Sequence, residues 1–435
     1  AEIEIAASLD PNNSLIRSYL GKAFFEEKRT DLDGPEFKIA KELDPKDPTP
    51  YFYDAIRKQT INRPVEALRD FQKAIELNDN RAVFRSKLKL DSDEAARSSS
   101  LARVYSDLGF QQLALVEGWN SGNTDPTNHS AHRFLADSYA ARPRHEIARV
   151  SELLQSQLLQ PQNITPIQPR LAESNLFLIG SQGPGSLSFN EFNPIFNWNG
   201  AQAQFSVLAG ENDTIGGEFV LAAIQNKLSW SLGYNLFDTD GWRDNADQED
   251  RIANAFIQYE LSYRTSIQAE VRYRDTQKGD TRLRFFEDDF LPDLQQEERR
   301  QSFRLGFRHG FSPSSTLIGN FQYQDLDGNQ EDEPVPGIVG LSIDTDADAS
   351  GGELQHLFRS NYVNLVTGAG YFDIDSKNKL TTQLIFLTPP LTIQEIKVDG
   401  DVKHTNAYLY SYLYLPLDLT LTVGGSYDDF NADSD

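Results

Sequence analysis

The stretches LSWSLGYNL (228–236) and SIQAEVRYR (266–274) decide the fold, because apolar and polar residues alternate along both of them. In the second stretch one face carries Ile267, Ala269, Val271 and Tyr273, and the other carries Gln268, Glu270, Arg272 and Arg274. A side-chain period of two residues is that of a β-strand. Each stretch therefore predicts a strand with one apolar and one polar face.

The same alternation recurs through the second half of the chain. We count eleven segments, near 203–211, 214–225, 228–237, 251–262, 265–275, 300–310, 316–325, 352–360, 362–372, 404–415 and 417–429. Short turns at 225–227, 262–264, 311–315, 360–362 and 415–417 alternate with long acidic loops at 236–250, 275–298, 325–350 and 375–401. Outer-membrane barrels keep short turns in the periplasm and long loops outside. We therefore expect a transmembrane antiparallel β-barrel whose first strand rises from the periplasm.

A soluble β-sandwich or propeller is the competing interpretation, since it also uses short strands. Aromatic residues near the strand ends favour a membrane barrel, and so do polar residues on the face that would otherwise form a dry core. Bacterial single-chain barrels have an even number of strands. We therefore expect that further strands belong to the full protein and that this chain carries an incomplete barrel.

The first part of the chain shows helical self-similarity with a period of 34 residues. The recurring positions are Leu20, Gly21, Phe24, Phe37, Ala40 and Pro45, then Ala55, Ala67, Phe71 and Ala74, then Leu101, Ala102, Tyr105, Ala114 and Pro126, and finally Leu135, Ala136, Tyr139 and Ala148. This pattern resembles the tetratricopeptide (TPR) family, whose helix pairs stack into a solenoid. The resemblance implies a concave surface that binds proteins, with a rigid spacer as the simpler alternative.

The pattern departs from the family in two places. Asp33 stands where the family has Ala, and the segment 81–94 is inserted between two copies, as a loop or an extra helix. Pro11 lies 34 residues before Pro45, so the chain begins inside a repeat and we expect further repeats before Ala1. His129 and His132 lie three residues apart on an expected helix, and we interpret them as surface or packing residues rather than metal ligands.

Composition separates the two halves. We expect a periplasmic TPR domain at 1–160, a linker or lumen plug at 161–200, and the barrel at 201–435. The net charge of −24 disfavours nucleic acid as a partner. The chain has no Cys, which excludes disulfides and thiolate metal sites, and no Met, for which we have no physical explanation.

Two sets of side chains are candidates for binding chemistry. The expected lumen face carries Arg272, Arg274, Arg304, Arg308, Glu260 and Glu270. The arginines either bind carboxylates or phosphates in a pore, or pair internally with the two glutamates. The alternating Asp344, Asp346 and Asp348 suggest a weak Ca²⁺ site in an extracellular loop, bridging phosphates of lipopolysaccharide, although the full calcium-loop pattern fails. No catalytic motif is present, so we expect a protein that is not an enzyme.

Helical repeats followed by a barrel resemble the outer-membrane exporters of cellulose and of poly-N-acetylglucosamine. The resemblance implies an outer-membrane pore that exports a surface polymer such as an exopolysaccharide, with periplasmic or surface proteins docking on the TPR domain. The alternative is a protein-secretion module, or an anchor for an extracellular filament or surface assembly. A polysaccharide-modifying enzyme is a distant third, because no acid/base pair stands out.

Overall fold

A computed structural model describes most of the chain, with gaps between the described ranges. The described residues are 2–83, 87–140, 146–160, 162, 199–282, 286, 289–335, 337–387, 389–416 and 419–434. The expected linker or plug at 161–200 therefore lies outside the described residues, apart from 162, 199 and 200. No helix in the described ranges is long and apolar enough to cross a membrane.

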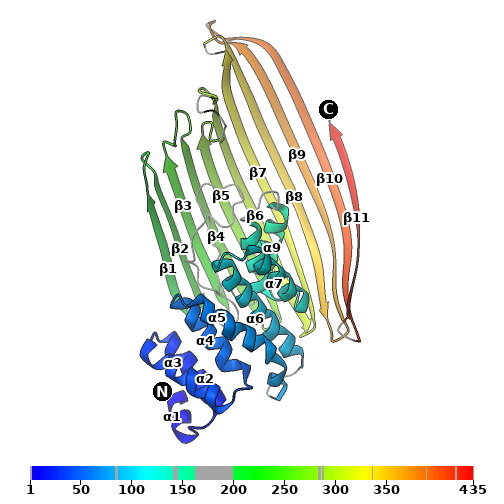
Figure 1. Ribbon diagram of the computed structural model, residues 1–435. Coiled ribbons are helices and arrows are strands. Elements are labelled where there is room, and N and C mark those ends of the chain that lie inside the picture. The colour runs from blue at the N-terminus through cyan, green and yellow to red at the C-terminus, as the bar shows by residue number, and fades with distance from the viewer. Residues whose placement is uncertain are drawn as a thin grey trace.

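The first part of the chain is helical and occupies one end of the molecule (Figure 1). Its elements are α1 (Glu2–Leu9), α2 (Ser14–Glu26), α3 (Thr30–Leu43), α4 (Pro48–Thr60), α5 (Pro64–Glu76), the 3₁₀ helix η1 (Asn78–Val83), α6 (Lys87–Asp107), α7 (Gln111–Thr124), α8 (His129–Ala140) and α9 (Glu146–Leu159). Local signals set their starts: the Asp47 side chain accepts a 2.9 Å hydrogen bond from the Thr49 amide, and Pro48 occupies the first turn.

Consecutive helices pack against each other as pairs, α2 with α3, α4 with α5, α6 with α7 and α8 with α9. Small residues bring the pairs together: a Cβ added to Gly21 would lie 2.8 Å from the Phe37 ring, which is fully buried. Most of the repeat positions are buried, namely Leu20, Phe24, Ala40, Ala67, Phe71, Ala74, Ala102, Ala114, Pro126 and Ala136. Tyr105 and Tyr139 are half-buried, Pro45 is exposed, and the Ala148 side chain lies outside the described part.

The two departures from the repeat pattern have structural explanations. Asp33, 1% exposed, accepts a 2.5 Å hydrogen bond from the Arg57 guanidinium, so a buried ion pair replaces the expected Ala. The inserted segment 81–94 contains neither a separate loop nor an extra helix over its described part. It ends η1 and forms the first turns of α6. Helix pairing is observed, whereas membership of the TPR family stays a prediction.

The second part of the chain is one antiparallel sheet of eleven strands over the described residues, paired in chain order from β1 to β11. The strands are β1 (Gly200–Ala209), β2 (Ile215–Gln225), β3 (Leu228–Thr239), β4 (Gln248–Ser262), β5 (Thr265–Lys278), β6 (Gln295–Ser312), β7 (Ser315–Val335), β8 (Val339–Arg359), β9 (Val363–Leu384), β10 (Leu391–Leu415) and β11 (Leu419–Ser434). The alternating pattern had predicted all eleven, and the short turns lie at the end of the sheet near the helices (Figure 1).

Two of the four segments that were expected to form long loops form strands instead, so this prediction was wrong for them. The segments 325–350 and 375–401 are mostly strand, because β7 pairs with β8 up to Val335 and β9 pairs with β10 up to Leu384. These segments carry many Asp, Glu and Lys residues, which had suggested loops, yet their backbone hydrogen bonds continue across the sheet. The sheet is consequently much taller on the β7–β10 side than on the β1–β3 side (Figure 1).

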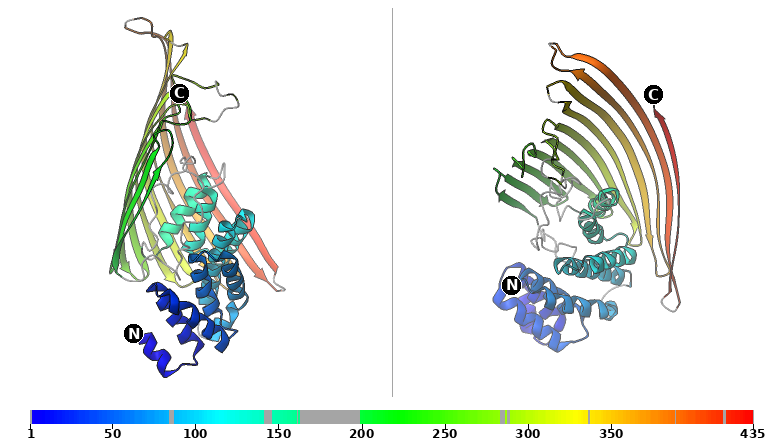
Figure 2. Two further views of the ribbon diagram at one scale, coloured as in Figure 1. Left: turned by 60° about the vertical axis from the view of Figure 1, so that its left-hand side comes forward. Right: turned by 45° about the horizontal axis from the view of Figure 1, so that its top comes forward.

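The sheet curves around the last helices, which lie on its concave side (Figure 2). Outward-facing residues near the short turns are apolar, and on β7 the outward positions run through Leu317, Gly319, Phe321 and Tyr323 before reaching Asp325 and Asp327. From Ser315 to Tyr323 the strand rises about 26 Å at 3.3 Å per residue. That length matches the apolar band, about 25 Å tall, of an outer-membrane barrel.

Candidate functional site

The arginines and glutamates expected on the lumen face lie on β4 to β6. The Glu270 carboxylate, 6% exposed, accepts hydrogen bonds from Arg304 and, at 2.6 Å, from Arg272. Arg274 donates at 3.0 Å to the buried Asp250, which also accepts a 2.6 Å bond from the Thr276 hydroxyl. Three of the four arginines therefore have carboxylate partners. Arg272 and Arg304 thus pair internally with Glu270, as one alternative had it, whereas Arg274 pairs with Asp250, which the sequence analysis did not name.

The remaining two candidates are less tightly joined. Arg308 on β6 interacts electrostatically with Glu260 on β4, and no salt bridge joins them among the described residues. We call these four side chains the arginine wall (Arg272, Arg274, Arg304 and Arg308). The wall also contacts the helical domain. Arg304 donates a hydrogen bond to the Gln157 side chain of α9.

The α9 helix packs directly on the wall. Leu158 and Leu159 form a buried cluster with Ile318 of β7 and Leu357 of β8. A Cβ added to Gly306 of β6 would lie 2.5 Å from Leu158, so glycine at this strand position lets the helix approach. The Gln258 side chain of β4 also donates a 2.8 Å hydrogen bond to the Gln160 carbonyl.

A second contact lies at the turn between α7 and α8, and we call it the latch (Asn123, Asp125, Arg359, Asn364 and Tyr414). Arg359 of β8 pairs with Asp125, and both side chains are at most 6% exposed. Asn364 and Tyr414 each donate to the Asn123 carbonyl, at 2.7 Å and 3.1 Å. Polar groups thus fix the turn between α7 and α8 to strands β8, β9 and β10 of the sheet.

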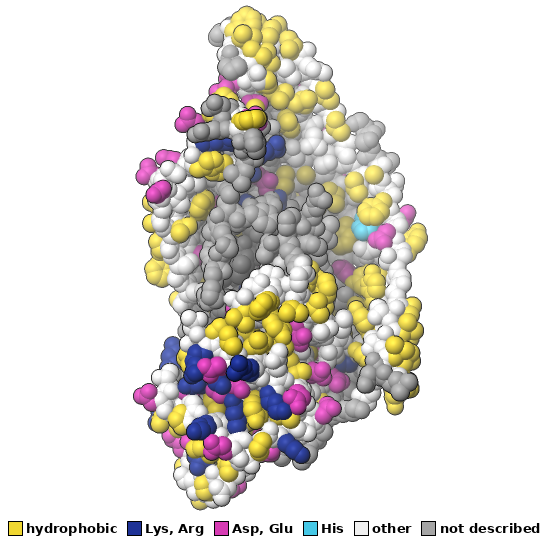
Figure 3. Space-filling view, viewed as in Figure 1, with side chains coloured by type: hydrophobic (Ala, Val, Ile, Leu, Met, Phe, Trp, Pro, Cys, Tyr) yellow, Lys and Arg dark blue, Asp and Glu magenta, His cyan; other side chains and the backbone are white. Residues whose placement is uncertain are grey.

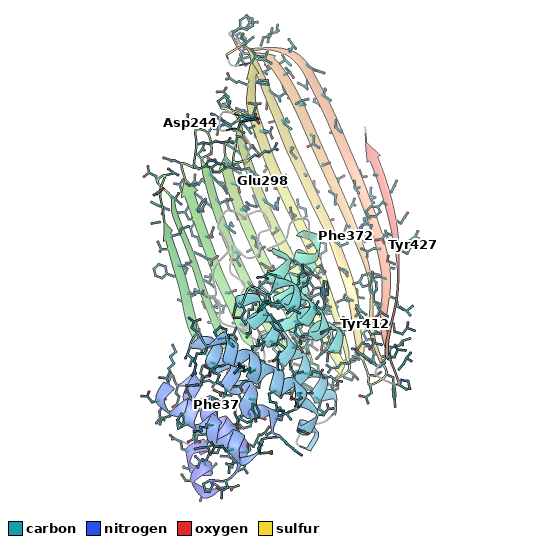
Figure 4. The ribbon with its side chains drawn as sticks, viewed as in Figure 1. Phe37, Asp244, Glu298, Phe372, Tyr412 and Tyr427 are labelled. Carbon is teal, nitrogen blue, oxygen red and sulfur yellow. The ribbon has the colours of Figure 1, made fainter. Side chains whose placement is uncertain are left out.

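Between these contacts lies a groove of about 560 Å³, bounded by α7, α8 and α9 on one side and by β8 to β11 on the other. Its sheet side follows the segment YLYSYLYL (408–415), in which every second residue is Tyr. Tyr408, Tyr410 and Tyr412 line the groove, and Trp119 of α7 faces them. Figure 4 shows Tyr412 beside the helices and Phe372 higher on the same flank of the sheet.

Glycines on the neighbouring strands set the orientation of two of these rings. Tyr408 pairs across the sheet with Gly368, and Tyr410 pairs with Gly424. A Cβ on either glycine would lie within 2.5 Å of the tyrosine ring, so the rings lie over the space that a side chain would fill. An aromatic ring that covers a strand glycine presents its other face to the groove. Sequence analysis missed this tyrosine stripe, because it used the segment 404–415 only as one of the eleven expected strands.

His129 and His132 are both buried, so they are not surface residues. Nδ1 of His132 contacts the Glu152 carboxylate of α9, and Nε2 lies 2.9 Å from the Pro126 carbonyl. Burial alone lowers the pKa of His132, but Glu152 and the carbonyl outweigh it and raise the pKa above its usual value. Burial, with Arg308 and His132 nearby, lowers the pKa of His129 to about 4.

The prediction of a Ca²⁺ site in an extracellular loop is wrong, because its expected ligands lie on a strand. Asp344, Asp346 and Asp348 lie within β8, opposite Asn329, Asp327 and Asp325 of β7. Alternate residues of an extended strand are about 6.6 Å apart along its axis, so three of them do not converge on one ion. Over the described part of the chain, no group of three or more His, Asp or Glu side chains has a geometry that suits a metal.

Comparison with known proteins gives no family. No family model and no curated protein matches the sequence. The sheet resembles solved structures that include the ferric yersiniabactin uptake receptor FyuA from Yersinia pestis (12% identity, TM-score 0.43, covering 54% of this chain and 43% of that chain). Others are the ferric citrate transporter FecA (13%, 0.43, 54% and 38%) and the copper transporter OprC (15%, 0.45, 55% and 41%).

The chain spans less than half the length of these three structures. TM-scores below 0.5 at such low identity assign neither a family nor a ligand to it. The comparisons also give no support to the resemblance to polysaccharide exporters or to the TPR family.

Proposed function

We propose that the chain is part of an outer-membrane transport barrel, whose strands cross the bilayer and whose last helices partly close the lumen. The outer face supports a membrane location. It carries an apolar band with tyrosines such as Tyr273, Tyr323 and Tyr371 at one limit, and charged rows follow beyond them. Such a band with aromatic limits is typical of outer-membrane strands.

The observation that carries the transport proposal is the groove between the helices and β8 to β11. If the helices served only to fill the sheet's concave side, side chains would pack throughout the contact. Instead a groove of about 560 Å³ lies beside the polar contacts between helices and sheet. Buried polar contacts such as Asp125–Arg359 can be exchanged for water, so they suit a contact that opens. Helices α7 to α9 would then act as an internal gate.

For the transported substrate we propose a surface polysaccharide. Tyr408, Tyr410, Tyr412 and Tyr414 follow one another at about 6.6 Å along β10, and aromatic faces stack against the apolar faces of sugar rings. A stripe of such rings offers successive weak contacts, which lets a chain bind and move on. We propose that the polysaccharide passes without chemical change.

Conductance in planar bilayers tests the gate. We expect the full chain to conduct weakly and Arg359→Gln to conduct several-fold more, because the substitution breaks the latch while leaving the outer face intact. Arg300→Gln is the matched control, since Arg300 pairs with Glu298 at 2.8 Å on the concave face of the same sheet, away from the helices. If the wild type, Arg359→Gln and Arg300→Gln all fold and insert but none of them conducts, transport is refuted.

A second candidate is an anchor or protein-secretion module, and one observation favours it. Helix α7 carries an exposed apolar stripe, with Leu113 53%, Val116 46% and Trp119 44% exposed, beside Phe110 at 53%. Hydrophobic side chains gather on the helices next to the hollow of the sheet (Figure 3). Two results together would support this candidate: no conductance in the bilayer, and loss of binding to a periplasmic or surface protein in Val116→Glu.

A further inference from the structure

We propose that the groove holds a site for a primary ammonium group, formed by Glu353, Gln355, Asn406 and Asp428, which we call the ammonium site. All four residues line the groove. The inference rests on the proposed function, because it names the class of ligand that binds in the groove assigned there to transport. It differs from the sequence expectation, in which the arginines were candidate ligands for anions, with internal pairing as the alternative.

The strand register brings the charged members of the site onto one row. Glu353 of β8 is opposite Gly370 of β9, Gly370 is opposite Asn406 of β10, and Asn406 is opposite Asp428 of β11. Partners across a sheet project from the same face. Because Gly370 has no side chain, the space between Glu353 and Asn406 on this row is not filled by the intervening strand.

Two buried oxygen acceptors at the site lack donors. Gln355 is 8% exposed, and its Nε2 donates a 2.9 Å hydrogen bond to the Tyr408 hydroxyl. Its Oε1 is buried and has no hydrogen-bond partner among the described residues, and the same holds for Oδ1 of Asn406. Buried acceptors normally have donors. An ammonium group carries three N–H donors and no acceptor, so it matches what these oxygens lack.

The charge of the groove has the sign that suits a cation. Glu152, Glu353 and Asp428 line it, whereas its described lining contains no Lys or Arg. Glu152 is matched by His132, and Asp428 lies 3.0 Å from His404. Glu353 accepts a hydrogen bond from the Tyr408 hydroxyl and forms no salt bridge in the described part of the chain. Glu353 is therefore the carboxylate available to a ligand.

Aromatic rings border the row on both sides. On one side His404 stacks between Phe430, with ring centroids 3.9 Å apart, and Phe372, at 6.1 Å. On the other side Tyr408 and Tyr410 have their ring centroids 5.7 Å apart. Cations are attracted to aromatic faces, and the attraction grows when water is excluded. Carboxylates, free acceptors and rings thus converge on one ligand chemistry.

The test is equilibrium binding of small probes to the full chain in detergent, measured by calorimetry at pH 6. Glucosamine carries the ammonium, N-acetylglucosamine is its neutral counterpart, and glucuronate is an anion of the same size. We expect glucosamine to bind at least tenfold more tightly than the other two. Glu353→Gln should weaken glucosamine binding about tenfold, and Glu298→Gln, the matched loss of a concave-face carboxylate outside the groove, should leave it unchanged.

Equal binding of glucosamine and N-acetylglucosamine would refute the site, and so would a folded Glu353→Gln protein that binds glucosamine normally. Gln355→Leu provides a second variant if the first misfolds, and it should also weaken binding. Butylammonium separates two sources: binding as tight as that of glucosamine indicates an alkylammonium ligand, whereas weaker binding indicates an amino sugar. Binding is measured without a membrane, so a silent bilayer would refute transport alone.

Discussion

At the scale of single residues, His132 joins three elements of the helical domain. Its two ring nitrogens face the Glu152 carboxylate and the Pro126 carbonyl, which are both acceptors. Only the imidazolium donates from both nitrogens. The charged ring therefore ties α8 to α9 and to the turn that carries the latch. Asp125, which acts on the ring through its charge, lies in that same turn.

This charge state makes stability depend on pH. The folded pKa of His132 is raised above its usual value of 6.5, so its contribution is complete below pH 6.5 and is lost as the pH rises through the folded pKa. His129 acts in the opposite direction: its folded pKa of about 4 stabilises above pH 6.5, and that contribution is lost as the pH falls toward 4. We expect His132→Gln to lower Tm at pH 6 and to change it little at pH 9.

Thermal unfolding in detergent at a series of pH values measures this effect as the difference in Tm between the wild type and His132→Gln. His309→Gln on β6 controls for the loss of one imidazole. A Tm difference that stays constant from pH 6 to pH 9 would show that His132 is not protonated in the fold.

At the scale of elements, sequence patterns predicted those strands whose two faces lie in different environments, because that difference leaves an alternating pattern within each strand. Alternation on β3 and β5 follows from an exposed apolar face on one side and polar contacts on the other, so it can be read from each strand without reference to its neighbours. The upper parts of β7 to β10 carry many Asp, Glu and Lys residues between their apolar ones, a composition that also fits an exposed loop. Their pairing depends on neighbouring strands, and the sequence of one strand alone does not contain it.

The site was predictable only in part, for the same reason. The arginine wall could be read from alternation, because Arg272 and Arg304 stand at polar positions of regular strands. The latch and the ammonium site combine residues from a helix turn and from separate strands, and no spacing rule joins Asp125 to Arg359 or Glu353 to Asp428. Two signals were present: Gly306 inside a strand, and the alternating tyrosines from Tyr408 onward.

Gly306 gives a prediction for the docking of α9. Gly306→Val places methyl groups where Leu158 now lies, and such overpacking costs about 1–3 kcal/mol. We expect faster hydrogen exchange in residues 151–160, while the β6 backbone stays protected. The control is Gly310→Val on the same strand, where an added Cβ has only one neighbour, at 3.8 Å. Unchanged exchange in α9 would mean that the helix does not depend on this contact.

At the scale of the whole molecule, the outer face offers a test of the proposed membrane location. Phe307 lies near the middle of the outward apolar run of β6, between Phe303 and Phe311, and all three are at least 36% exposed in the isolated chain. The charged rows begin beyond the tyrosines, at Asp325 on β7 and Asp348 on β8. One surface therefore passes from apolar to charged along every one of these strands.

This gradient predicts a cost that depends on depth. Phe307→Arg should destabilise the lipid-embedded protein by about 2–4 kcal/mol, because it places a charge near the bilayer midplane, and Asp327→Arg should change stability by about 0–1 kcal/mol. Denaturant titration in lipid vesicles measures both. A soluble sandwich would show no such difference between two exposed positions, so equal effects would contradict the membrane assignment.

The latch has one more consequence, which concerns cooperativity. One oxygen of Asp125 accepts hydrogen bonds from Thr127, at 3.0 Å from its amide and 2.6 Å from its hydroxyl, and the other oxygen pairs with Arg359. The same carboxylate thus shapes the turn before α8 and holds that turn to β8. Undocking leaves this carboxylate to reorganise in water, so we expect separation from the sheet and loosening of the turn to be coupled. The gate should therefore open as an all-or-none event rather than by gradual loosening.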